Sequence, residues 1–265
     1  MSRGSLDRLL GIMARLRDPD GGCPWDREQT FATIAPHTIE EAYEVVEAID
    51  TGDVAALKEE LGDLLFQVVF YAQIAGERGL FDFDDIGAGI SDKMVRRHPH
   101  VFGEARIADA EAQTAAWEDH KQRERHVKAA AAATPPSALD GVSTTLPALS
   151  RAAKLQKRAA RVGFDWPAPT DVLPKLIEEI DEIAREIVGG NEKKLEEEVG
   201  DLLFSCVNLA RKLKIDPEAA LRRGNRKFDA RFRKIEQALA ASGRTPADAT
   251  LAEMDALWDM LKREE

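Results

Sequence analysis

Apolar residues recur every three to four positions along most of this chain, which is the spacing of an amphipathic helix, while the alternation typical of strands is nearly absent. The first such segment carries apolar side chains among charges at Leu6, Leu9, Leu10, Met13 and Leu16. Further helices are predicted at roughly 37–50, 54–77, 84–97, 110–127, 172–188, 192–213, 217–241 and 250–264. The pattern therefore predicts an all-α protein.

Two pairs of these helices are separated by very short segments. Thr51-Gly52-Asp53 lies between the helices of the first pair, and Gly189-Gly190-Asn191 lies between those of the second. Such glycine-containing segments are typical of tight turns between helices, and Pro36 and Pro174 suit the first turn of the helix that follows them. Each pair is predicted to form an antiparallel αα-hairpin within a small bundle of four or so helices.

The second half of the sequence repeats the first. Residues 59–66 (EELGDLLF) match residues 197–204 (EEVGDLLF) at seven of eight positions, with an offset of 138. Lys93 and Arg97 resemble Lys227 and Arg231 at an offset of 134, and the pairs Trp117, Lys121 and Trp258, Lys262 are related by 141. We therefore predict a tandem duplication: one domain over 1–127, an Ala- and Pro-rich linker over 128–142, and a second domain over 143–265.

Carboxylates occupy corresponding helix faces in the two copies. Residues three apart share a face of a helix, and a short turn brings that face against the neighbouring helix. The spacing therefore predicts that one quartet gathers in each hairpin: Glu41, Glu44, Glu60 and Asp63 in the first copy, and Glu179, Glu182, Glu198 and Asp201 in the second.

The neighbours of these carboxylates favour a metal site over a solvated charged face. The segment 61–71 is apolar on nearly every side, so Asp63 is expected on a mostly buried helix. Four carboxylates packed there need cations or protons to offset their repulsion. Ligands that are all oxygen select hard ions such as Mg²⁺ or Mn²⁺, and the Glu-x-x-His pair of a di-iron bundle does not occur in the sequence. If only one copy were present, a solvated helix face would be the better interpretation of these charges. Because the same spacing recurs beside an apolar helix in the second copy, the metal site is favoured instead.

Composition and charge narrow the function further. A net charge of −11 disfavours binding to nucleic acid polymers, which requires a basic surface. Charged residues interrupt every apolar run before it reaches the roughly 20 residues of a membrane span, and the start of the chain is unlike a signal peptide. Cys23 and Cys206 are far apart and belong to no C-x-x-C motif, so no disulfide framework is indicated. We expect a cytoplasmic protein.

The pattern E-E-x-x-E, followed after a gap by E-x-x-D, resembles the MazG family of nucleotide pyrophosphohydrolases, and residues 22–31 (GCPWDREQTF) resemble its long, two-domain bacterial members. The resemblance covers essentially the whole chain. It implies that the acidic residues bind Mg²⁺ and that a nucleoside triphosphate is hydrolysed to a monophosphate and pyrophosphate. It also implies a homodimer in which helices of two subunits complete each bundle.

The resemblance also implies roles for single residues of the second copy. Glu179, Glu182, Glu198 and Asp201 are expected as metal ligands, and Glu178 as a further ligand or as the group that orients water. The expected substrate contacts are Lys175, Asn225, Lys227 and Arg231 for the phosphates and neighbouring groups, and Trp258 near the base.

The second copy is expected to be the main catalytic one. The first copy has His37 where the second has Lys175, Phe70 where it has Asn208, and Ser91 where it has Asn225. Two alternatives remain open at this point: a metal- or nucleotide-binding regulatory protein without turnover, and a pyrophosphohydrolase acting on another nucleotide such as a guanosine alarmone. The first copy keeps all four acidic residues, and its role stays open too.

Overall fold

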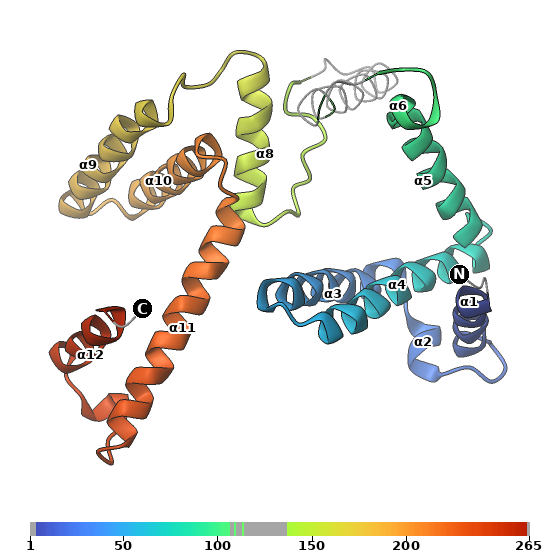
Figure 1. The fold of residues 1–265 in the computed structure, drawn as a ribbon, viewed down its shortest axis with the longest axis horizontal. Coiled ribbons are helices and arrows are strands. Elements are labelled where there is room, and N and C mark those ends of the chain that lie inside the picture. The colour runs from blue at the N-terminus through green and yellow to red at the C-terminus, as the bar shows by residue number, and fades with distance from the viewer. Residues whose placement is uncertain (1–3, 107–108, 110–112, 114–136, 264–265) are drawn as a thin grey trace. The chain divides into compact units, whose positions relative to one another are not determined.

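A computed structural model describes residues 4–106, 109, 113 and 137–263 of the chain (Figure 1). In these ranges every regular element is an α-helix or a short 3₁₀ helix, so the prediction of an all-α protein is confirmed. The chain forms two compact units that meet in sequence after residue 120. None of the described helices combines the length and the apolar composition required to cross a bilayer.

The first unit is built around one helical hairpin. Helices α3 and α4 pack side by side along their length, α1 packs on α4, and α5 follows α4 and contacts it (Figure 1). The helices of this unit are α1 (Gly4–Leu16), α2 (Pro24–Glu28), α3 (Phe31–Thr51), α4 (Val54–Glu77), α5 (Phe83–Arg97) and α6 (Pro99–Phe102).

The second unit repeats this order of elements. Helices α9 and α10 form its hairpin, α8 packs on α10 and α11, and α12 packs on α11 (Figure 1). Its elements are α8 (Ala148–Arg161), η1 (Pro169–Val172), α9 (Leu173–Gly189), α10 (Glu192–Lys212), α11 (Pro217–Ala240), η2 (Pro246–Asp248) and α12 (Leu251–Arg263). The helix predicted at 110–127 and most of the predicted linker lie outside the described residues.

The two predicted hairpin turns are confirmed. Gly52 and Gly190 have left-handed backbones, with φ of 74° and 70°, and each ends the first helix of its pair. The residue after each glycine caps the next helix: the Asp53 side chain accepts bonds from the amides of Ala55 and Ala56, and the Asn191 side chain accepts one from Lys194. The cap follows the glycine directly, so each hairpin needs only a short connection.

The expectation for Pro36 was wrong, while the one for Pro174 is confirmed. Pro174 lies in the first turn of α9. Pro36, in contrast, lies inside α3, because Thr30 begins that helix upstream through a capping box with Thr33. The helix continues past Pro36 at the cost of one backbone hydrogen bond, since proline has no N–H to donate.

Helix α4 is buried along only part of its length. The core of the first unit contains Val69, Phe70 and Ile74 of α4 with Met13 of α1 and Ile34 of α3. Leu61 and Leu65, nearer the start of α4, remain 50% and 41% exposed. The prediction that 61–71 lies mostly buried therefore holds only for its C-terminal part, where α1 covers the hairpin. The acidic part of the hairpin has an open apolar surface beside it.

Gly22 is predicted to be required by the turn that follows α1. A Cβ atom at this position would meet the Leu16 carbonyl oxygen and would lie 2.6 Å from the Asp18 oxygen and 2.7 Å from the Asp18 nitrogen, all of them backbone atoms. We expect Gly22→Ala to lower the free energy of unfolding by about 1–3 kcal/mol. Gly21→Ala is the matched control, because a Cβ there meets nothing within 4 Å. Thermal unfolding of the two variants, followed by circular dichroism, tests the difference; equal midpoints would contradict it.

Candidate metal centres and active site

The hairpin of the second unit gathers three of the four predicted carboxylates. Glu179 and Glu182 lie three residues apart on α9 and face Glu198 on α10, and one oxygen of each lies within 4.8 Å of the others. Glu179 is only 2% exposed, whereas Glu182 and Glu198 are half-buried. Asp201, one turn beyond Glu198, is exposed at the edge of this group.

The carboxylates of this group repel one another. Partial burial raises the pKa of Glu198, and the charges of Glu182, Glu179 and Asp201 raise it further. Both causes disfavour the ionised form. A positive charge placed among these side chains would relieve both, and carboxylate oxygens are donors that a hard divalent cation accepts.

Lys175 supplies positive charge to this cluster from within the protein. Its Nζ lies 2.8 Å from Glu179 Oε1 and 3.0 Å from Glu178 Oε1, one turn further along the same helix. These two hydrogen bonds raise the pKa of Lys175 above its ordinary value. The lysine expected to contact phosphate is thus held by two of the acidic residues expected to act in catalysis.

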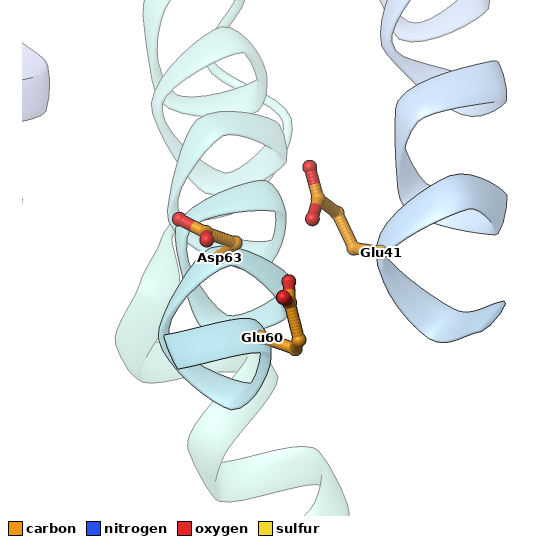
Figure 2. Close-up of side chains that lie close together, drawn as sticks. All are labelled: Glu41, Glu60 and Asp63. Carbon is orange, nitrogen blue, oxygen red and sulfur yellow. The ribbon is translucent and has the colours of Figure 1, made fainter. Parts of the chain in front are cut away.

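The first unit contains the corresponding cluster. Figure 2 shows Glu41 on α3 facing Glu60 and Asp63 on α4, and one oxygen of each lies within 4.8 Å of the others. Partial burial raises the pKa of Glu41 and of Glu60, and the charges of Asp63 and Glu44 raise both further. Glu44 is exposed beside the group.

The quartets are less buried than the sequence led us to expect. Asp63, Glu44 and Asp201 are exposed, and Glu179 is the one member of either quartet that is fully buried. The reason is that each hairpin has only two helices at its acidic part, so the carboxylates line an open edge and not the interior of a closed bundle.

Two of the substrate contacts expected on α11 and α12, Arg231 and Trp258, lie together in the described part of the chain. The Arg231 guanidinium lies 5.1 Å from the centre of the Trp258 ring, and that ring lies 5.4 Å from Phe228. Arg231 is buried, while Asn225 and Lys227 are exposed on the same helix. Packing on a tryptophan face orients a guanidinium without neutralising it, so the Trp258 contact fixes the position of the Arg231 charge.

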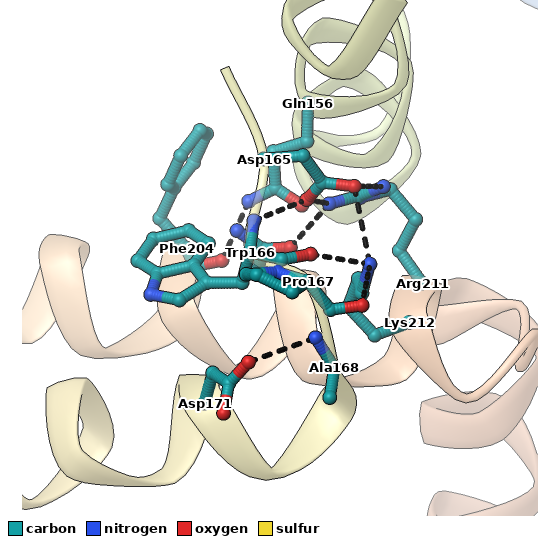
Figure 3. A network of polar contacts seen from close by, with 10 residues as sticks. Gln156, Asp165, Trp166, Pro167, Ala168, Asp171, Phe204, Arg211 and Lys212 are labelled. Atoms are coloured by element: carbon teal, nitrogen blue, oxygen red, sulfur yellow. Dashed lines mark hydrogen bonds and ion pairs between the residues drawn. The ribbon is translucent and has the colours of Figure 1, made fainter. Parts of the chain in front are cut away.

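A network that the sequence analysis missed ties the loop before α9 to the end of α10 (Figure 3). Arg211 binds the Asp165 carboxylate and donates to Asn208 Oδ1 at 2.7 Å. Lys212 Nζ donates to the Trp166 carbonyl at 2.6 Å and to Asp165 Oδ2 at 3.2 Å. The cations of Arg211 and Lys212 hold the pKa of Asp165 below its ordinary value.

This network sets where α9 begins. Ala168, directly after the anchored loop, donates its backbone N–H to Asp171 Oδ2 at 2.9 Å and so starts the short 3₁₀ helix that leads into α9 (Figure 3). Lys175, Glu178 and Glu179 lie in the first two turns of that helix. Arg211 and Lys212 are adjacent basic residues in the sequence, but their partner Asp165 lies 46 and 47 positions away, so residue spacing within one helix does not predict the contact.

The first unit anchors its corresponding loop with different residues. Arg17, after α1, forms an ion pair with Glu77 at the end of α4, with Nη2 and Oε2 separated by 2.7 Å. The same guanidinium donates to the carbonyls of Asp26 and Gln29, at 3.2 Å for Gln29. In both units a cation bound to loop carbonyls and to a carboxylate joins the loop to the second hairpin helix.

The fold and these sites define a protein of two helical copies, each with a carboxylate cluster in its hairpin. The family model described as the MazG nucleotide pyrophosphohydrolase domain matches residues 29–102 and 168–235, which are the two hairpins with the helix that follows each. This chain belongs to the MazG nucleotide pyrophosphohydrolase family.

Three relatives share sequence with the chain to different extents. A nucleoside triphosphate pyrophosphohydrolase of Escherichia coli K12 is 54% identical over 98% of both chains. A nucleoside triphosphate pyrophosphohydrolase/pyrophosphatase MazG of Thermotoga maritima is 43% identical over 97% of this chain and 95% of its own. A nucleoside triphosphate pyrophosphohydrolase of Mycolicibacterium smegmatis is 35% identical over 63% of this chain and 49% of its own. The first two similarities therefore include both copies.

The Asp165 network is predicted to stabilise the second unit only while Asp165 is ionised. Because the folded state lowers its pKa, the carboxylate contributes stability above its ordinary pKa of 3.8, and that contribution is lost as the pH falls through the lower folded value. We expect Asp165→Asn to lower the unfolding temperature at pH 7 and to differ less from the parent near pH 3.

Thermal melts at both pH values measure this effect. Asp181→Asn is the matched control, because Asp181 is an exposed aspartate on α9 of the same unit. A difference between Asp165→Asn and the parent that stays the same from pH 7 to pH 3 would show that the ion pairs contribute nothing.

Proposed function

We propose that the second copy hydrolyses nucleoside triphosphates to nucleoside monophosphates and pyrophosphate, with Mg²⁺ held by Glu179, Glu182, Glu198 and Asp201. The chain is a pyrophosphohydrolase by family, and two relatives matched along nearly its whole length are named for nucleoside triphosphates. The observation that carries the proposal is the convergence of three carboxylates on a buried Glu179 that also binds Lys175.

The donor set fits the ion that we propose. Mg²⁺ prefers a few carboxylates together with waters and substrate phosphates, and the open edge of this cluster leaves room for both. When bound, such an ion neutralises phosphate charge and lowers the pKa of a bound water. Mn²⁺, with similar ligand preferences, is an expected substitute.

The neighbouring side chains have distinct tasks in this proposal. Glu178, exposed and next to Glu179, orients the attacking water and accepts its proton. Lys175 binds the phosphates in this proposal, because its Nζ already lies at the cluster, and a cation held by the carboxylates would free it from Glu178 and Glu179.

The positive charges on α11 take up the charge that develops as pyrophosphate leaves. Lys227 and Arg231 carry it, with Arg231 oriented by Trp258, and Asn225 adds an amide. In this proposal the ring of Trp258 lies near the nucleobase of the substrate. This division leaves the carboxylates to hold the cation and the α11 side chains to hold the phosphates.

The polar residues of the second copy favour it as the catalytic one. Asn208 is buried on α10 and binds Arg211, whereas Phe70 at the corresponding position of α4 belongs to the apolar core. Lys175 pairs with Glu179, whereas the corresponding His37 lies 3.5 Å from Glu40. The first copy therefore provides neither the amide nor the ammonium group at these places.

Removing one ligand from each copy tests the assignment. We expect Asp201→Asn to lower kcat/KM for nucleoside triphosphates by at least about 100-fold, since it removes charge that holds the cation. Asp63→Asn, the matched change in the first copy, is expected to leave kcat/KM within about twofold of the parent. Chromatography of the products, with separate assays for pyrophosphate and orthophosphate, measures turnover and the bond broken.

Two results would reject the proposal. Equal losses in Asp201→Asn and Asp63→Asn would reject the division between the copies. Release of orthophosphate in place of pyrophosphate by the parent protein would reject the bond that we assign.

We also propose that the protein works as a homodimer. Exposed apolar residues recur on one side of α9 and of α10, including Ile177, Ile180 and Ile187 on α9, and Val199 and Leu203 on α10. Exposed apolar patches of this kind mark surfaces that a partner covers. A second hairpin packed on this side would turn the two-helix hairpin into a four-helix bundle and would bury the open edge of the carboxylate cluster.

Cys206 provides a probe for this interface, because it is exposed on the same side of α10, three residues beyond Leu203. In a Cys23→Ser background, we expect slow labelling of Cys206 by a thiol reagent in the dimer. Leu203→Glu is expected to shift the sedimentation coefficient to that of a monomer and to speed the labelling, because it places a charge in an apolar contact. A monomeric parent with a rapidly labelled Cys206 would contradict the dimer.

Two further parts of the proposal concern partners and location. With a net charge of −11, we expect no affinity for nucleic acid polymers. A cytoplasmic location suits the proposed substrates, which are intracellular nucleotides.

A further inference from the structure

Helix α11 is far more basic than the stretch that corresponds to it in the first copy. Residues 217–234 contain seven Lys or Arg and two acidic residues, although the whole chain carries a net charge of −11. The corresponding residues 83–100, at the offset of 134, contain three Lys or Arg and three Asp. Because the first copy keeps counterparts of both cations expected to contact phosphate on α11, the excess positive charge comes from other positions of that helix.

Part of this excess charge is open to a ligand. Arg233 is engaged in an ion pair with Asp229, with Nε and Oδ2 separated by 2.8 Å. Arg223 and Lys227, in contrast, are exposed on consecutive turns of α11, and no carboxylate of the described residues pairs with either. Residues four apart share a face of a helix, so these two cations lie on one side of α11, about 6 Å apart along its axis. The position of Arg223 is Gly89 in the first copy.

The contacts of α12 give a bound nucleotide a direction along α11. Helix α12 folds back beside the C-terminal half of α11 (Figure 1). There the Trp258 ring lies 5.4 Å from Phe228 and 5.1 Å from the Arg231 guanidinium. The proposed function places the base near Trp258 and the phosphates at Arg231 and Lys227. A phosphate chain that starts there and passes Lys227 reaches Arg223, one turn nearer the N-terminus of the helix.

We propose that Arg223 is a further substrate-binding residue, which contacts the terminal phosphates of the nucleoside triphosphate and so selects for the length of the phosphate chain. A guanidinium donates two parallel hydrogen bonds to phosphate oxygens, and no carboxylate of the described residues competes for that of Arg223. These bonds hold the pyrophosphate end of the substrate, which a nucleoside monophosphate lacks. The inference rests on the proposed function and adds to it a residue that recognises the leaving group.

Steady-state kinetics of Arg223→Gln in the full chain test the inference. We expect KM for a nucleoside triphosphate with Mg²⁺ to rise about tenfold, the loss typical of a hydrogen bond between charged groups. Competitive inhibition by inorganic pyrophosphate is expected to weaken by a similar factor. Inhibition by the product nucleoside monophosphate is expected to stay within about twofold of the parent, because that product has no terminal phosphates. Arg223→Lys keeps the charge without the paired donors, so its KM is expected to lie between the two.

Lys234→Gln is the matched control. It removes an exposed cation from the same helix, again one that pairs with no carboxylate of the described residues, but Lys234 lies on the other side of Arg231 along α11. We expect its KM to stay within about twofold of the parent. Equal losses in Arg223→Gln and Lys234→Gln would overturn the proposal, because the overall positive potential of α11 would then explain both. An unchanged KM in Arg223→Gln, or equal weakening of inhibition by both products, would overturn it as well.

Binding of inorganic pyrophosphate separates this inference from the proposed function. Isothermal titration calorimetry with Mg²⁺ needs no turnover, and the dissociation constant is expected to rise about tenfold in Arg223→Gln and to stay unchanged in Lys234→Gln, with circular dichroism confirming that helical content is kept. Equal affinity in the parent and in Arg223→Gln, or a parent that does not bind pyrophosphate at millimolar concentration, contradicts the inference. Failure of the proposed function would instead appear as absent pyrophosphate release by the parent protein, whatever the binding result.

Discussion

In both copies the carboxylates gathered at the hairpin repel one another, and the side chains beside them have to offset that repulsion. Packing of two antiparallel helices brings these side chains within 4.8 Å of one another in each copy, and partial burial together with like charge then raises the pKa of Glu41, Glu60 and Glu198. A hydrogen-bond donor or a positive charge beside such a cluster offsets part of this repulsion. The second copy supplies Lys175, and the first supplies the amide of Gln67. The two compensations are chemically different, since one is a charged ammonium group and the other is a neutral amide.

The hairpin must also begin at a fixed place, because the first turns of α9 carry Lys175, Glu178 and Glu179. Each unit anchors the loop before its hairpin through a cation that binds loop carbonyls and a carboxylate, with Lys212 and Asp165 in one unit and Arg17 and Glu77 in the other. The cation comes from the end of the second hairpin helix in one case and from the segment after the first helix in the other. The two units thus anchor this loop in the same way but with different residues.

Each hairpin has two helices, whereas a closed bundle has four, so one side of each hairpin is left open. The carboxylates line that edge, and the apolar side of α9 and α10 lies uncovered beside it. Arg231 and Trp258 meanwhile form a group on α11 and α12 that is already ordered by its own ring contacts. Hydrolysis of a triphosphate needs cation and phosphate contacts around one substrate, which is why the proposed function and the proposed dimer belong together.

The sequence by itself determined the helices of both hairpins, the glycine turns between them and three of the four carboxylates in each cluster, because these follow from residue spacing within a few turns of helix. It placed the start of α3 too late, since the Thr30 cap outweighs the preference of Pro36 for a first turn, and it overestimated the burial of α4. Only the tertiary structure decided that Lys175 turns to Glu179, that Gln67 reaches Glu41, and that Asp165 is anchored by residues 46 and 47 positions away. Such contacts depend on rotamers and on packing between segments, and local periodicity carries no information about either.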